Sequence, residues 1–158
     1  MKRLVITLIA FSILIFAGIY WANPFGTASW DPRARTVGYV TFRIPSTAMA
    51  PTLRPGDFIL VQTGAYASAP PKVGDIITFR YPRDLAIDYV KRVAAGPGDK
   101  ISIKNGVVYV NSNPIPEIYL AGVTLLKPYS ITMDEMTISP VQLLVLGVNR
   151  DDSSDSRI

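Results

Sequence analysis

The sequence of 158 residues contains no cysteine and no histidine. Without cysteine, disulfides, thiol nucleophiles and cysteine-based metal sites are excluded. Without histidine, the chain lacks the usual general base of serine hydrolases and the commonest metal ligand. Proton transfer near neutral pH would therefore fall to a carboxylate or to a lysine with a shifted pKa. We expect no metal and no organic cofactor.

The chain has little excess charge: 16 Lys and Arg against 12 Asp and Glu give a net charge of +4. The basic residues are scattered, which weakly favours an anionic membrane surface as partner and gives little support for nucleic acid. The length suits one domain with a core of its own. We therefore expect one domain plus an anchor.

The one long apolar run follows a short basic head at residues 1–3. Residues 4–22 carry no charge, and at ~1.5 Å per residue they would form a helix of ~28 Å, close to the ~30 Å hydrocarbon core of a bilayer. Tyr20 and Trp21 fit an interfacial aromatic belt, and Asn23-Pro24 ends the helix. The alternative is a cleavable signal peptide, since residues 26–28 weakly match a small-x-small site. Length favours an uncleaved transmembrane anchor.

The rest of the chain predicts a mainly β domain of antiparallel sheets at residues 37–158, after a polar linker at 23–36. Short runs rich in β-branched and aromatic residues alternate with Gly, Pro and Asp turns, and few of the connections have room for a crossover helix. Asn105-Gly106 is a favoured hairpin turn. Residues 114–135 predict a hairpin excursion and a loop. The expected strands are 37–44, 57–62, 75–81, 89–94, 100–104, 107–111 and 141–146.

Four blocks of sequence, in this order, resemble the type I signal peptidases, membrane-bound serine proteases with a lysine general base. Any one block would be a weak match, but four in sequence are specific. The blocks are IPSTAMAPTL at 44–53; GDFILV at 56–61 with GDIITF at 74–79; DYVKRV at 88–93 with GPGD at 96–99; and GVNRDDSSDSR at 147–157.

The resemblance implies a site whose nucleophile is missing. Ala48 stands at the position of the attacking serine, and a methyl group cannot attack a carbonyl. Lys91 would be the general base, which requires burial to lower its pKa from ~10.4 by as much as ~3–5 units. Ser153 would hold the lysine amine, and Ser46 would join the backbone N–H of position 48 in the oxyanion hole. Taken alone, Lys91 would more often be a surface charge.

The resemblance also implies a substrate, a structural salt bridge behind the site and a cellular location. Signal peptides of exported preproteins would be cut after small residues, with the lipid bilayer as second partner and the domain on the outer side of the cell membrane. Asp155 and Arg157 would form a supporting salt bridge. The cleft would be lined by Phe42, Ile44, Pro45, Met49, Leu53, Ile59, Tyr89 and Val90. Charge leaves the orientation open, because Lys2 and Arg3 are balanced by Arg33 and Arg35.

Three departures from the family pattern leave alternatives open. Because Lys91, Ser46 and Ser153 all remain, Ala48 favours a serine-to-alanine replacement in an intact enzyme, which would be inactive. Val148 replaces the usual aspartate, and the chain stops where relatives usually continue, as a truncated or a short natural form. The alternatives are a natural signal-peptide-binding protein and a specialised peptidase that matures a pilin-like or conjugation substrate. A self-cleaving repressor is disfavoured, because an apolar segment stands in place of a helix-turn-helix.

Overall fold

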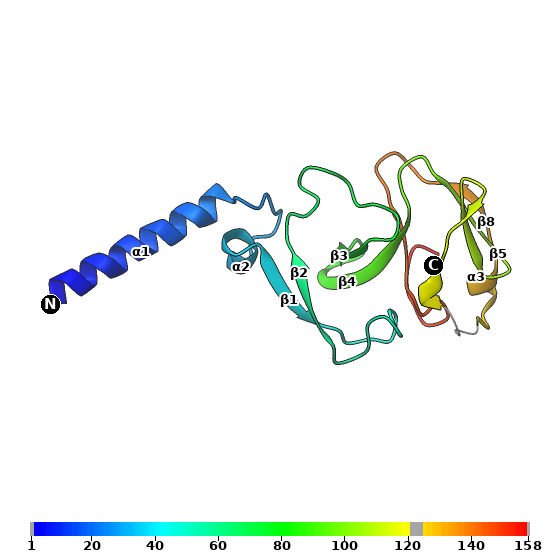
Figure 1. Cartoon of the computed structure of the whole chain (residues 1–158), viewed down its shortest axis with the longest axis horizontal. Helices are drawn as coiled ribbons and strands as arrows, with labels where there is room; N and C mark the ends of the chain where they lie inside the picture. The colour runs from blue at the N-terminus through cyan, green and yellow to red at the C-terminus, as the bar shows by residue number, and fades with distance from the viewer. Residues whose placement is uncertain (1, 121–124, 158) are drawn as a thin grey trace. The chain divides into compact units, whose positions relative to one another are not determined.

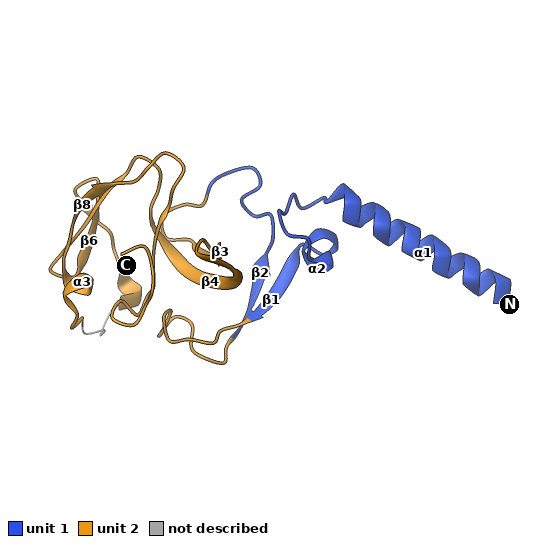
Figure 2. Ribbon diagram, turned by 180° about the vertical axis from the view of Figure 1, so that it is seen from behind, with its two compact units in different colours: residues 1–42, 58–70 blue, residues 43–57, 71–158 orange. Residues whose placement is uncertain are grey.

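The computed structural model describes residues 2–120 and 125–157. Met1 and Ile158, at the ends of the predicted head and domain, lie outside this range, as do residues 121–124 of the predicted excursion. The chain forms two compact units (Figure 2). Unit 1 comprises residues 1–42 and 58–70, and unit 2 comprises residues 43–57 and 71–158.

Unit 1 begins with the apolar helix α1, Lys2–Ala22, in which no residue is buried (Figure 1). Helix α1 is long and apolar enough to cross a membrane, as the sequence predicts. Its two hydroxyl side chains are satisfied within the helix, since Thr7 and Ser12 donate to the carbonyl oxygens four residues earlier. Such internal bonding is what a lipid environment requires of a polar group.

The predicted linker contains a short helix, α2, Pro32–Thr36. Asp31 caps it by accepting the N–H of Arg33 at 2.8 Å, and Pro32 occupies a first-turn position where no N–H is needed. The Arg35 guanidinium lies 4.2 Å from the ring centre of Trp30 and 5.2 Å from that of Tyr20. These contacts order a segment for which the sequence predicted no element.

Strands β1 (Tyr39–Arg43) and β2 (Phe58–Gln62) form a two-stranded sheet. Unit 2 holds two further sheets. The first, in the order β3-β4-β9, consists of Ile76–Tyr81, Asp84–Ala95 and Leu144–Leu146. The second, in the order β7-β6-β5-β8, consists of Asn113–Pro114, Val107–Val110, Lys100–Lys104 and Met133–Thr137.

The strand pairings in the described part of unit 2 are all antiparallel, which confirms the predicted fold class. The hairpin turn between β5 and β6 is also confirmed, because Asn105 and Gly106 both have positive φ. The core of unit 2 packs side chains from both sheets: Ala94, Ala95, Ile101, Ile103, Val108, Ile138, Leu144 and Leu146.

The largest differences from the expected elements fall in residues 114–135. Instead of a simple hairpin and loop, this stretch holds the 3-10 turn η1 (Ile118–Leu120), the helix α3 (Pro128–Ile131) and the start of β8. The long strand β4 starts at Asp84 rather than at residue 89, because residues 84–88 extend the hairpin with β3. The last strand is short, Leu144–Leu146, because Pro140 and the turn after it precede the paired residues.

Candidate active site

Three of the four predicted catalytic positions, Ser46, Ala48 and Lys91, line a cleft of about 300 Å³ in unit 2, and Ser153 is not among its lining residues. Two segments far apart in the chain form most of its wall: the irregular stretch that follows β1 and the middle of β4. The closing segment, residues 147–157, adds the rest. The lining residues are Ile44, Pro45, Ser46, Ala48, Met49, Ile87, Asp88, Tyr89, Val90, Lys91, Asp152 and Ser154.

Ala48 is held by the closing segment. It is buried, with 8% of its surface exposed, and its carbonyl oxygen accepts the N–H of Asn149 at 3.0 Å. Its own N–H donates to none of the residues that the structure describes. A free backbone donor beside a cleft is the arrangement that an oxyanion hole needs.

Lys91 extends from β4, where it pairs with Ile77 of β3, and only 5% of its surface is exposed. Its Nζ lies 5.0 Å from the ring centre of Tyr89. Burial lowers the pKa of Lys91. The negative charge of Asp155 raises this pKa, and the positive charge of Arg157 lowers it further. The net result is a lowered pKa, which is the direction that a lysine base requires.

Ser153 is buried beside Gly147 in the closing segment. A Cβ on Gly147 would collide with the Ser153 side chain and lie 2.7 Å from the Ala48 carbonyl oxygen, so only glycine allows this close approach. Ser153 Oγ is near enough to Asp155 to lower the pKa of that carboxyl group, but it makes no hydrogen bond of regular geometry within residues 2–120 and 125–157. A buried hydroxyl of this kind is free to bond a further group.

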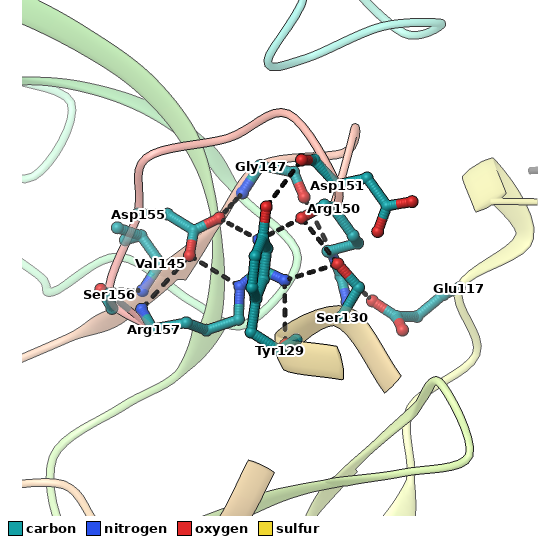
Figure 3. Close-up of polar contacts among 10 residues, drawn as sticks. All are labelled: Glu117, Tyr129, Ser130, Val145, Gly147, Arg150, Asp151, Asp155, Ser156 and Arg157. Atoms are coloured by element: carbon teal, nitrogen blue, oxygen red, sulfur yellow. Dashed lines mark hydrogen bonds and ion pairs between the residues drawn. The ribbon is translucent and has the colours of Figure 1, made fainter. Parts of the chain in front are cut away.

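Asp155 and Arg157 form a buried ion pair, with Arg157 Nε 2.8 Å from one carboxylate oxygen (Figure 3). The other oxygen accepts the N–H of Gly147 at 2.8 Å, and Arg157 also donates to the carbonyl oxygen of Arg150. Burial alone would raise the pKa of Asp155, but the hydrogen bonds from Arg157 and Gly147 and the Arg157 charge hold it below its ordinary value. The pair therefore ties the ends of the closing segment together.

Six of the eight residues predicted to bind substrate can be compared with this cleft within unit 2. Five line it: Ile44, Pro45, Met49, Tyr89 and Val90. Leu53 does not line it; its N–H donates to the carbonyl oxygen of Met49 instead. Phe42 and Ile59 belong to unit 1, on β1 and β2, so their role stays a prediction.

The sequence reasoning did not single out Ile87, Asp88, Asp152 and Ser154, which also line the cleft. Asp88 adjoins Tyr89, and Asp152 and Ser154 adjoin Ser153, so these three lie next to chosen residues of the same motifs. Ile87 lies two residues before Tyr89, outside the motif, and no signal in the sequence pointed to it. Asp152 also accepts a hydrogen bond from Thr47 Oγ1, which joins the nucleophile segment to the closing segment.

Val148 is fully buried, at 0% exposure. A valine needs no polar partner there, whereas an ionised aspartate would need one. In the described part of the chain, no group of three acidic side chains is placed to hold a metal ion.

Comparison with known proteins shows which family the chain belongs to. The sequence matches the family described as signal peptidase, peptidase S26, over residues 2–158. The chain belongs to this family. It is 37% identical over 122 residues to the probable signal peptidase I-1 of a Synechocystis species, covering 73% of the chain and 60% of that protein. It is 35% identical to signal peptidase I of Pseudomonas aeruginosa, covering 73% of the chain and 54% of that protein. The chain thus spans between half and two thirds of these relatives.

A solved structure of the family shares the fold. The signal peptidase I of Enterococcus faecalis is 29% identical, with a TM-score of 0.50, and the match covers 56% of this chain and 85% of that one. The signal peptidase fold expected from the four sequence blocks is therefore confirmed.

Proposed function

We propose that this chain carries the site of a membrane-anchored Ser/Lys endopeptidase that removes signal peptides from exported preproteins, and that Ala48 makes it inactive. The observation that supports this most directly is the buried Lys91 on the same cleft as Ala48. A lysine is almost never fully buried unless it is paired. A lowered pKa beside the nucleophile position is typical of a general base.

With a serine at position 48, the reaction follows from the groups around the cleft. The hydroxyl oxygen attacks the scissile carbonyl carbon while neutral Lys91 accepts the hydroxyl proton. The negative oxygen that forms is stabilised by the backbone N–H of residue 48 and by the Ser46 hydroxyl. When the C–N bond breaks, protonated Lys91 gives its proton to the leaving amine. Water then hydrolyses the acyl-enzyme, with Lys91 again as base.

Substrate and location follow from the cleft and from α1. Ile44, Met49, Tyr89 and Val90 present apolar surface on the cleft, which fits small apolar side chains before the cut. Helix α1 would anchor the chain in the cell membrane, with the peptidase domain on the outer side. The lipid bilayer and a preprotein are then its partners.

The test is cleavage of a preprotein in detergent or liposomes by Ala48→Ser. We expect cleavage after a small residue, with none by the parent chain or by Ala48→Ser/Lys91→Ala. In the serine background, Ser46→Ala should lower the rate by about 10²–10³, the cost of one oxyanion donor. Cleavage that survives loss of Lys91 would contradict the proposal.

Ala48 itself favours a second candidate, a protein that binds signal peptides without cutting them. The cleft is present while the nucleophile is absent. If Ala48→Ser does not cleave but the parent chain retains a signal peptide in a pull-down, binding is the better description. Cleavage confined to a pilin-like or conjugation substrate would instead identify a specialised peptidase.

A further inference from the structure

A partly buried chain of polar contacts outside the cleft, here called the bridge, connects the strand of Lys91 to the segment of Ser153. It starts at Arg150, whose side chain is 1% exposed. Arg150 Nε donates to the carbonyl oxygen of Gly147 at 2.8 Å, and Arg150 Nη2 pairs with the carboxylate of Glu117 (Figure 3). Gly147 is the residue packed against Ser153 and the Ala48 carbonyl. The position of Arg150 therefore affects the centre of the site.

The same bridge reaches β4 from its other end. The Tyr119 hydroxyl donates to the Glu117 oxygen that Arg150 also contacts, at 2.7 Å. The Arg92 guanidinium stacks on the Tyr119 ring at 4.0 Å, and Arg92 Nη1 donates to the carbonyl oxygen of Gly74. Arg92 is next to Lys91 in β4 and pairs with Leu146, the residue before Gly147.

Glu117 is therefore the acceptor shared by both halves of the bridge. Its side chain is 9% exposed, and two donors from different segments meet on one of its oxygens. Burial, together with the hydrogen bond to Glu117, raises the pKa of Tyr119, so the phenol keeps the proton that it donates. A carboxylate that accepts one buried donor, from Arg150, and one half-buried donor, from Tyr119, restrains both of them.

We propose that Glu117 is a positioning residue that holds Lys91 and Ser153 in register by bridging Arg150 and Tyr119. This inference rests on the proposed function. Glu117 is not among the residues that line the cleft, and its polar partners in the described part of the chain are Arg150 and Tyr119, so its effect passes through Gly147 on one side and through Arg92 on the other. Without the carboxylate, the closing segment loosens against β4 and water reaches the Lys91 amine.

The expected signature is a change in the pH dependence of Lys91. Hydration of the amine moves its pKa back toward the ordinary value, so more alkaline solution is needed to deprotonate it. The titratable and charged groups around Lys91 are Asp88 and Tyr89 from β4 and Asp152, Asp155 and Arg157 from the closing segment. Replacing Glu117 leaves all of these groups in place. A shift in the pKa of Lys91 would therefore report a change in how they are arranged around the amine.

The first experiment compares Ala48→Ser with Ala48→Ser/Glu117→Gln. We expect kcat at neutral pH to fall about tenfold, which corresponds to one pH unit in the pKa of the base. KM should be unchanged. The rise of kcat with pH, here called the pH limb, should move to higher pH, so activity should recover in alkaline solution. Glu135→Gln is the matched control. Glu135 lies on β8, where it forms an exposed salt bridge with Lys100 of β5.

A second control separates positioning from loss of stability. Ile101→Val removes one methyl group from the fully buried core and should lower stability without moving the pH limb. If Glu117→Gln does not fold, Tyr119→Phe removes one donor to Glu117 while keeping the ring under Arg92. It should shift the limb in the same direction, by less. A folded variant with an unmoved limb overturns the proposal.

The bridge can also be tested without catalysis, in the chain with Ala48. Lys91 is labelled with acetic anhydride across a range of pH, with exposed Lys72 as internal reference, and the peptides are quantified by mass spectrometry. Lys91 should reach half-maximal labelling at lower pH than Lys72, and Glu117→Gln should reduce this difference. If Ala48→Ser does not cleave while the labelling shifts, the proposed function fails but the bridge stands. If the labelling does not shift, the bridge is overturned.

Discussion

Helix α1 and unit 2 depart from the usual distribution of residues in opposite directions. Helix α1 exposes apolar side chains along its whole length and buries none. Unit 2 buries charged side chains, among them Lys91, Arg150 and Asp155. Water stabilises neither arrangement, because exposed apolar surface and unpaired buried charge both raise the free energy of a protein in water.

The two regions resolve this problem differently. Helix α1 needs a different solvent, and its length and internally bonded hydroxyls suit a bilayer. Unit 2 instead supplies partners: Arg150 has Glu117, and Asp155 has Arg157. Lys91 is the exception, because the described residues give its amine only the ring of Tyr89 and the charge of Asp155, with no salt bridge. An incompletely compensated lysine is what a base needs.

The largest expected effect comes from removing one partner of a buried pair. Arg150→Ala leaves the nearly buried Glu117 carboxylate without its cationic partner, and we expect unit 2 to lose about 3–5 kcal/mol of stability. Amide hydrogen exchange of β5 measures this loss. Replacing both partners, by Arg150→Met with Glu117→Leu, should restore most of it, and Arg80→Ala on the surface of β3 should change little. A large loss in the double variant would show that the pairing is not the cause.

A charge in the middle of α1 should have the next largest effect. Ile13 is 62% exposed near the centre of the helix, and an arginine there costs about 2.5–3.5 kcal/mol in a membrane. We expect Ile13→Arg to reduce the fraction of protein that resists alkaline extraction from membranes, whereas Ile13→Leu should not. Equal retention of both variants would argue that α1 does not span the bilayer.

The smallest effect is a pH-dependent gain from removing the buried lysine. Unfolded Lys91 has an ordinary pKa of ~10.4, whereas burial lowers the folded pKa, so folding is penalised at neutral pH. This penalty is complete below the folded pKa and disappears as the pH rises through it toward ~10.4. Lys91→Met should therefore raise stability at pH 7, and the gain should shrink in alkaline solution.

Lys91→Met in the Ala48→Ser background should abolish cleavage while it increases stability. Exposed Lys72→Met is the control and should alter neither property. Stability is read from hydrogen exchange at several pH values. A gain that is independent of pH would mean that packing, rather than the lysine charge, is responsible.

The sequence alone determined the elements that depend on local chemistry. The uncharged run at residues 4–22 was sufficient to predict α1, and Asn105-Gly106 was sufficient to predict the hairpin of β5 and β6, because helix length and turn conformation depend on neighbouring residues. The four blocks also carried the fold and the family, and they supplied the candidate residues Ala48, Lys91, Ser46 and Ser153 together. These predictions were possible because the spacing of residues within a motif can be read from the sequence alone.

The tertiary structure alone decided which of those residues share an environment. Burial of Lys91 depends on segments more than forty residues away in the chain, and no pattern around Lys91 itself distinguishes it from a surface lysine. Glu117 and Tyr119 lie in the stretch for which the sequence predicted only a hairpin excursion and a loop. Their role depends on contacts with Arg150 and Arg92, which are distant in the chain. Helix α2 likewise depends on the stacking of Arg35 on Tyr20 and Trp30. Local sequence fixes conformation over a few residues, whereas burial and charge pairing arise only when distant segments pack together.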